Sequence, residues 1–141
     1  MDSIRTINGK WGELWIEGEL AAEVYGFQAK LTITKESVPM CGHVMIDKKV
    51  MSVEGTGSVR MYKVYSRMID LMADGLLSGR DTRFTLISKL ADPDAFGAER
   101  IAVTGVSFDD LTLADWEVAT LGKIEAPFTF SGYELLDRIG G

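Results

Sequence analysis

The chain has 141 residues, of which 46% are hydrophobic and 26% charged, so it is long enough to form one domain with its own core. Its net charge of −6 argues against a protein that coats nucleic acid or an anionic membrane, because both partners require a basic surface. The single cysteine excludes an intrachain disulfide and favours a reducing compartment, and no apolar run is long enough to span a membrane or act as a signal sequence.

Three strands are predicted in the first half of the chain. Residues 13–17 predict a short strand, which a turn at Gly18-Glu19 would bring back toward the next one. Residues 27–34 alternate apolar and polar side chains, which is typical of a half-buried strand. The apolar face of that strand consists of Phe27, Ala29, Leu31 and Ile33. Residues 57–64 alternate again, and Gly55 and Gly57 mark the start of this third strand.

One helix is predicted, over residues 66–79, because apolar side chains recur there at spacings of three and four. Ser66 is the expected N-cap and Gly79 the expected end. The apolar stripe consists of Met68, Ile69, Met72 and Leu76, and we expect it to pack on the chain's own sheet. The polar side, with Arg67, Asp70 and Asp74, would then be available to a neighbouring molecule.

The second half returns to β structure. Residues 83–90 and 99–108 each predict a strand, and residues 116–130 predict one or two more. Pro127 indicates an edge position or a strand end, because proline cannot donate to the ladder. Residues 131–141 are interpreted as a tail that packs on the domain or on a neighbour. The whole pattern predicts a single domain over residues 1–141, mainly β, built as an antiparallel sandwich or barrel with one flanking α-helix.

Residues 36–54 pose a question, because they connect two predicted strands and yet are rich in apolar side chains. Connections normally run over the surface and are polar. The residues that stand out are Val38, Met40, Cys41, Val44, Met45, Ile46, Val50, Met51 and Val53.

No catalytic, cofactor or metal motif emerges from the sequence. Cys41 and His43 would supply two soft ligands, whereas a structural zinc site needs four. The pattern at Gly55–Gly57 departs from the dinucleotide fingerprint, since Arg60 stands at its last glycine and a strand follows. Residues 92–94 lack the remaining carboxylates of a calcium loop. We therefore expect neither an enzyme nor a cofactor or metal.

Several segments occur in an order and at spacings that resemble the XkdM-like tail tube proteins of contractile phage tails and defective phage-like particles. The segments are 9–19, 54–72, 84–90, 99–110 and 126–137, so the resemblance covers nearly the whole chain. Its most specific part is the glycine-rich strand start that continues into the helix, followed by the strand Pro127–Phe130. The residues of that first part are Gly55, Gly57, Tyr62, Lys63 and Ser66.

The resemblance implies a phage tail tube fold and a structural role. Such subunits form hexameric rings that stack into a hollow tube inside a contractile sheath. The implied partners are further copies of the chain, the tail sheath protein, and baseplate and tail terminator proteins. DNA would be only cargo in the lumen, and no membrane or cofactor is involved. The implied location is the tail of a virion or phage-like particle, assembled in the bacterial cytoplasm.

The resemblance also suggests what residues 36–54 do. It makes them an extended loop or hairpin that contacts the adjacent ring, so that their apolar side chains are buried on assembly, and methionine suits such irregular interfaces. The alternative is that they fold over the chain's own core. Trp11, Trp15 and Trp116 are expected in the core or at a ring interface. The acidity fits a channel that does not bind DNA, or else an outer face toward the sheath.

Two other functions remain open from sequence. One is a tube subunit of a non-contractile tail or a related secretion device. The other, from a different class, is a monomeric β-barrel that binds a small ligand in a closed pocket.

Overall fold

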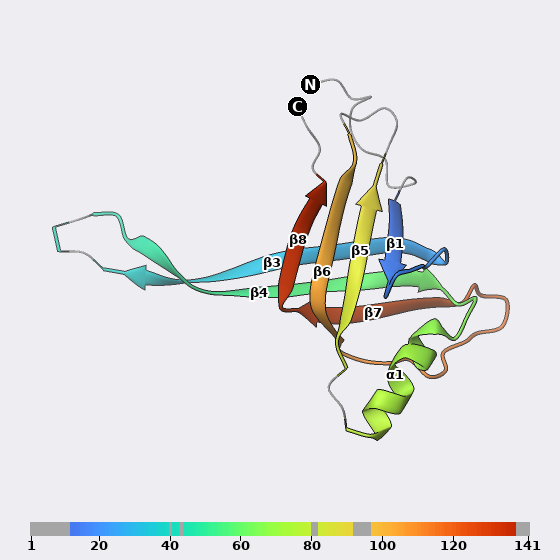
Figure 1. The fold of residues 1–141 in the computed structure, drawn as a ribbon. Coiled ribbons are helices and arrows are strands. Elements are labelled where there is room, and N and C mark those ends of the chain that lie inside the picture. Colours follow the sequence, from blue (N-terminus) through green and yellow to red (C-terminus); the bar gives the residue numbers. More distant parts are fainter. Residues whose placement is uncertain (1–11, 40, 43, 80–81, 92–96, 138–141) are drawn as a thin grey trace.

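The strands form two layers that run crosswise to one another, with the helix beside one of them (Figure 1). The computed structural model describes residues 12–39, 41–42, 44–79, 82–91 and 97–137. The first layer contains β1 (Gly12–Ile16), β2 (Glu19–Leu20), β5 (Phe84–Leu90), β6 (Glu99–Phe108) and β8 (Gly132–Asp137). The second contains β3 (Val24–Val38), β4 (Asp47–Tyr62) and β7 (Lys123–Phe130), and α1 (Arg67–Leu77) follows β4.

The two layers are joined through β6. All strand pairs are antiparallel and follow the order β2-β1-β5-β6-β7-β4-β3, with β8 paired to β6. The first part of β6 pairs with β8 up to Thr104, and its last residues, Ser107 and Phe108, pair with β7. Gly105 lies between the two parts with φ +63°, a conformation that favours glycine. A bend at Gly105 therefore carries the strand from one layer into the other, as in orthogonal sheet packing.

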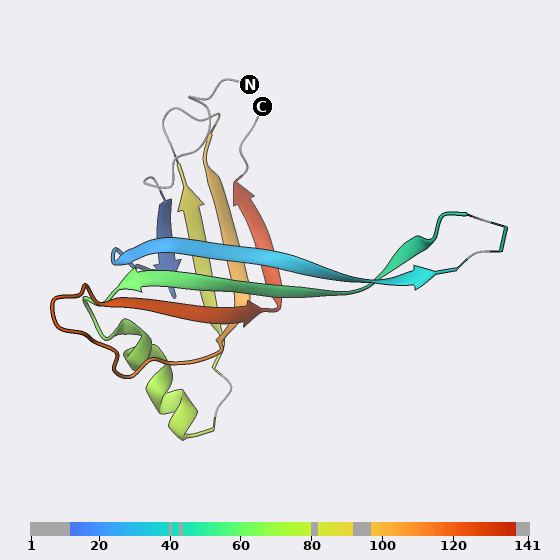
Figure 2. The same ribbon diagram turned by 180° about the vertical axis from the view of Figure 1, so that it is seen from behind.

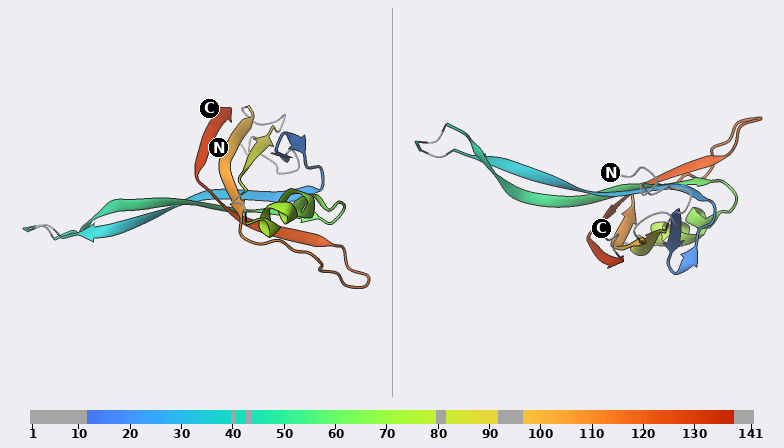
Figure 3. Two further views of the ribbon diagram at one scale, coloured as in Figure 1. Left: turned by 60° about the horizontal axis from the view of Figure 1, so that its bottom comes forward. Right: turned by 90° about the horizontal axis from the view of Figure 1, so that it is seen from above.

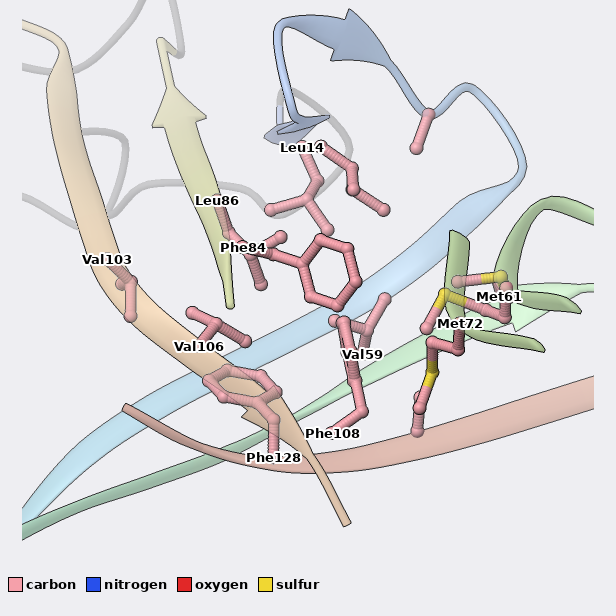
Figure 4. Close-up of a cluster of buried hydrophobic side chains, with 14 residues drawn as sticks. Leu14, Val59, Met61, Met72, Phe84, Leu86, Val103, Val106, Phe108 and Phe128 are labelled. Atoms are coloured by element: carbon pink, nitrogen blue, oxygen red, sulfur yellow. The ribbon is translucent and has the colours of Figure 1, made fainter. Parts of the chain in front are cut away.

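The core lies between the crossed layers and is closed by the helix (Figure 4). Its most completely buried side chains are Phe128, Met61, Leu86, Val59, Val103 and Val106. Phe128 is central, because its ring lies 5.9 Å from the rings of both Phe27 and Phe108. The fold class is confirmed: mainly antiparallel β structure with a single short helix among the described residues.

The helix confirms most of the predicted stripe. Met68 and Met72 are buried in the core and Ile69 is half-buried. Leu76 was placed on the same stripe wrongly, since it is 59% exposed. In Figures 1 and 2 the last turn of α1 runs beyond the edge of the second layer. Ser66 precedes the helix, and its carbonyl accepts the N–H of Asp70 at 3.0 Å, as expected of an N-cap position.

Two sequence predictions about strands are wrong. Residues 109–122 form an irregular connection, so the strand expected from residue 116 begins only at Lys123. The first strand does not return to 27–34, because the turn at Glu17-Gly18 leads into β2 and the other neighbour of β1 is β5. The expected tail contains a strand of its own, β8, which pairs with β6 and so packs on the domain.

Pro127 lies inside the sheet order rather than at an edge. However, β7 pairs with β6 only through Phe128 and Thr129, and the N–H of Asp109 donates to the carbonyl of Pro127 at 2.8 Å just after β6 ends. In an antiparallel strand the N–H and C=O of one residue point to the same side. Pro127 therefore lies just beyond the last residue of β6 that pairs with β7. No hydrogen bond of the β6–β7 ladder depends on an N–H at this position.

Candidate assembly surfaces

The main surface feature is a long two-stranded arm. β3 and β4 pair along their whole length, from Val24 opposite Met61 to Val38 opposite Asp47. Pairing of β4 with β7 stops at Gly55. The described residues between 31 and 53, which we call the arm, therefore extend beyond the two layers as a ribbon (Figures 1 and 2).

The arm explains where the residues predicted at 36–54 lie. Residues 36–38 continue β3, and residues 47–54 belong to β4, so much of the segment is hairpin strand rather than loop. The predicted apolar residues that the structure describes are all exposed, and they are Val38, Val44, Met45, Ile46, Val50, Met51 and Val53. Met45, for example, is 85% exposed. Cys41 is exposed as well, whereas Met40 and His43 lie outside the described residues.

Two further apolar residues of the arm belong to the strand that was expected to be half-buried. Phe27 packs against the core, but Leu31 and Ile33, on the same face of β3, are about half exposed. The alternation correctly indicated one face, and it gave no sign of where the covering layer ends. The arm's apolar face is thus a continuation of the core-facing side of the second layer.

An open groove lies between the layers at the root of the arm. It has a volume of about 450 Å³, and its lining includes Phe27, Leu31, Phe130, Tyr133 and Leu135. Tyr133 and Leu135 are themselves about half exposed. The monomeric binding barrel would require a closed pocket, so this open groove does not favour it.

A second surface, missed by the sequence analysis, is the connection at residues 109–122. Its exposed apolar side chains are Leu113, Trp116, Val118 and Leu121. Trp116 is 80% exposed, so a core position for it is excluded, whereas Trp15 in β1 is half-buried and Trp11 lies outside the described residues. The connection contains Asp109, Asp110, Asp115 and Glu117 and no Lys or Arg, which gives it a formal charge of −4. We call it the acidic segment.

The arm and the acidic segment lie at opposite ends of the second layer (Figure 3). The register fixes this placement, because β7 begins with Lys123 opposite Tyr62 and ends with Phe130 opposite Gly55. The acidic segment leads into the start of β7, whereas the arm leaves beyond its end. The absence of Lys and Arg over fourteen successive residues was the available signal for this surface.

The motif residues Tyr62 and Lys63 form the joint between the second layer and the helix. The N–H of Tyr62 donates to the carbonyl of Glu23 at 2.9 Å, and the N–H of Lys63 donates to that of Gly122 at 2.7 Å. The side chains of Tyr25 and Tyr62 pack together at 4.7 Å between ring centroids. These contacts hold the chain entering α1 against two neighbouring loops.

Arg67, expected on the free polar side of the helix, is instead paired with a buried carboxylate. Its Nε lies 2.5 Å from Oε1 of Glu23, whose side chain is only 2% exposed, and an Nη lies 3.4 Å from Oε2 of Glu19. Burial alone would raise the pKa of Glu23. The hydrogen bonds from Arg67 and from its own backbone N–H, together with the charge of Arg67, outweigh burial and lower that pKa below its usual value. The pair thus ties the start of α1 to the β2–β3 turn.

The two glycines of the resemblance motif lie opposite the two phenylalanines of the other specific segment. Gly55 is the Cα partner of Phe130, and Gly57 is the partner of Phe128. The phenylalanine rings occupy the space that side chains on the two glycines would fill.

Among the described residues, no group of three His, Cys, Asp or Glu side chains is arranged to hold a metal ion. None of the helices in that part of the chain is long and apolar enough to cross a membrane.

Two crossed β layers, a flanking helix and a protruding arm define the fold of a tail tube subunit. A chain of the sheath–tube complex of an extracellular contractile injection system matches it with a TM-score of 0.72 at 7% identity, over 92% of this chain and 90% of that one. A family model described as "Phage tail tube protein" matches residues 1–137. The chain therefore belongs to the phage tail tube protein family, and the predicted role as a structural tube subunit is confirmed.

Relatives from Bacillus subtilis support this assignment. The phage-like element PBSX protein XkdM of strain 168 is 34% identical over 136 residues, which are 95% of this chain and 92% of that protein. A solved structure of a Bacillus subtilis protein is 33% identical, with a TM-score of 0.55 over 95% of this chain and 98% of that one. The resemblance predicted from sequence is thus confirmed.

Proposed function

We propose that this protein forms hexameric rings that stack into the inner tube of a contractile phage tail or phage-like particle. The whole chain, residues 1–141, acts as one tube domain, and residues 36–54 make the contact between rings. The role is structural, with no enzymatic activity and no cofactor. Assembly takes place in the bacterial cytoplasm, and any DNA is cargo that passes through the lumen.

The observation that carries this proposal is the arm. It presents a run of apolar side chains to water and folds over none of the described core. Exposed apolar surfaces of this kind on a soluble subunit mark an interaction site, or else promote aggregation. The free edge of β3, which ends the strand order, likewise calls for a partner strand. Ring formation and stacking bury the apolar surface and pair the edge.

The channel is lined, in this proposal, by the outer face of the second layer. Alternation along the strands places polar residues there, opposite the core-facing side. In register order these are Gln28, Lys30, Thr32, Glu54, Thr56, Ser58, Arg60, Lys123, Glu125 and Thr129. The face carries charges of both signs, with Arg60 directly opposite Glu125, and a large part of the net acidity lies instead in the acidic segment. A polar lining on which basic and acidic side chains are interspersed would allow DNA to slide, since phosphates bind to clustered Lys and Arg.

The partners proposed outside the tube are the sheath, baseplate and tail terminator proteins. Chains with this fold occur in the sheath–tube complex, in the tube-terminating cap of the anti-feeding prophage and in its baseplate. The exposed side chain of Asp70 on α1 is available for such contacts.

Negative-stain electron microscopy of the purified protein over a range of concentrations tests the proposal. We expect hollow rings at low concentration and tubes of uniform bore at high concentration. A protein that remains a monomer at every concentration, both alone and when mixed with preformed tube ends, would contradict it.

A further inference from the structure

We infer that the arm of one copy docks head to tail onto the acidic segment of a second copy. This inference rests on the proposed stacking of rings and identifies the surface that receives the arm. Both surfaces are described above.

The first argument is that both surfaces expose apolar side chains that a single copy leaves uncovered. On the arm, Ile33 pairs with Val53, and Val50 lies on the same face beyond a bulge at Met51. On the acidic segment, Trp116 and Val118 are 80% and 87% exposed. A large, rigid tryptophan is the kind of anchor that dominates interfaces, and flexible methionines adapt to it.

The second argument is charge complementarity. Lys35 pairs with Val50, and Lys48 pairs with Ser37, so both lysines lie on the arm's apolar face with no acidic residue directly opposite. The third arm lysine, Lys49, is opposite Glu36 on the other face. The acidic segment offers four carboxylates and no cation of its own. An apolar face bordered by two lysines therefore fits an apolar segment bordered by carboxylates.

The third argument is geometry. The two surfaces lie at opposite ends of the second layer (Figure 3), so copies stacked in one orientation can each place their arm on the acidic segment of the next copy. In that arrangement every added copy leaves an arm or an acidic segment free for a further copy, so the contact can repeat as an open stack. Contact between two arm tips would instead bring lysines together and would end after one pair. Of these two contacts, the head-to-tail contact is the one that continues from ring to ring.

Cross-linking through the single native cysteine tests the inference. Cys41 lies exposed at the arm tip, so a second thiol on the acidic segment, Val118→Cys, would sit beside it across the interface. A short bis-maleimide is added to the assembled protein, and cross-linked peptides are identified by mass spectrometry. Glu134→Cys provides the matched control, because it places an exposed thiol on β8, away from both surfaces.

We expect Val118→Cys to give a ladder of covalent multimers, joined by peptides that link Cys41 to the new thiol at position 118. The control Glu134→Cys should give no peptide that links Cys41 to position 134. If the wild-type protein forms tubes but Val118→Cys yields no peptide between Cys41 and position 118, the inference is wrong and the tube function stands. Predominance of Cys41–Cys41 peptides between rings would also overturn it, in favour of tip-to-tip contact. A wild-type protein that forms neither rings nor tubes and yields no inter-copy peptide would overturn both.

Discussion

The ring of Phe128 lies directly against Gly57, its partner across the β4–β7 ladder. A Cβ atom at position 57 would lie 2.6 Å from Cζ of Phe128 and 3.1 Å from the Cα of Ala29. Phe128 is 1% exposed and connects the rings of Phe27 and Phe108. The bare backbone at Gly57 is therefore what allows the central aromatic residue of the core to sit on the second layer.

Substitution Gly57→Ala should destabilise the subunit. The added methyl group meets a buried ring on one side and backbone of β3 on the other, and neither can move without disturbing the core or the ladder. Overpacking of this kind costs about 2 kcal/mol of unfolding free energy. Urea denaturation measures the loss, with Ser52→Ala in the exposed arm of the same strand as the control, expected within about 0.5 kcal/mol of wild type. Equal stability of the two variants would refute the packing argument.

Removing only one charge of the buried pair Glu23–Arg67 should lower the unfolding free energy more than removing both charges. Arg67→Met leaves the carboxylate of Glu23 buried without its cation, a change that costs about 3 kcal/mol in comparable cases. The double variant Glu23→Gln, Arg67→Met removes both charges and should recover part of that loss. Denaturation of the single and double variants forms the cycle that measures the coupling. Additive losses would mean that the two side chains do not interact.

The same pair should make stability depend on pH in the acid range. The folded-state pKa of Glu23 is lowered, chiefly by Arg67 acting against burial, from an ordinary value of 4.5. Its contribution is therefore fully present above pH 4.5 and is lost as the pH falls through the lower folded-state value, because the unfolded chain takes up the proton first. Thermal unfolding at successive pH values should show a smaller acid loss in Glu23→Gln than in wild type. Parallel curves for the two proteins would contradict the assignment.

The bend in β6 gives a further prediction about stability. Gly105→Ala combines two costs, because its φ of +63° disfavours any side chain and the new methyl group would meet the side chain of Ser131. We expect a loss of about 2 kcal/mol. Gly18→Ala is the matched control, since Gly18 has a φ of +82° and open space around it, and it should incur only the conformational cost of about 1 kcal/mol. If both variants lose the same stability, Ser131 does not restrict the bend.

Strands with one face packed against the other layer were predictable from sequence, because their apolar and polar residues alternate. The positions at which the other layer stops covering them were not predictable. The apolar positions of 27–34 and 57–64 indicated the correct faces, and residues 99–108 were predicted with the observed bounds of β6. The alternation continues into the arm, where Leu31 and Ile33 still point to the core-facing side although the first layer leaves both about half exposed. Period-two patterning reports a shared face, and burial depends on what lies across from it.

The ion pair and the acidic segment were missed for a related reason. Glu23 and Arg67 are 44 residues apart, so only the fold brings them together. Trp116 and Val118 fell within a predicted strand, whereas the structure leaves them exposed in an irregular connection outside both layers. Apolar residues destined for another copy of the chain produce the same local pattern as residues destined for the core. An assembly surface was visible in the sequence only as an anomaly, such as the apolar connection at 36–54. Periodicity could not distinguish its residues from those of core strands.

A charge placed on the exposed arm should weaken assembly without affecting the folding of the subunit. Met45→Asp places a charge at an 85% exposed position, so the unfolding free energy should change by less than about 0.5 kcal/mol. Assembly should weaken severely, because the carboxylate would lose its water when the tip is buried against the next ring. Sedimentation velocity compares it with Met45→Leu, which keeps the side chain apolar and should assemble like wild type. Normal tubes from Met45→Asp would show that the arm tip stays in water.

Charge reversal across the inferred contact gives the final prediction. Asp115→Lys, Glu117→Lys should raise the concentration needed for stacking about tenfold, since each partly exposed ion pair contributes about 0.5–1 kcal/mol. Adding Lys35→Glu, Lys48→Glu on the arm exchanges the signs of both surfaces and should restore stacking. Reversal of Glu13 and Glu134 to Lys changes the net charge by the same amount on exposed positions of the other layer, and should have little effect. The stacking defect should also become smaller at about 1 M salt, where the Debye screening length falls to roughly 3 Å. Failure of the four-residue exchange to restore stacking, while each variant remains folded and forms rings, would place the arm's lysines against some other surface.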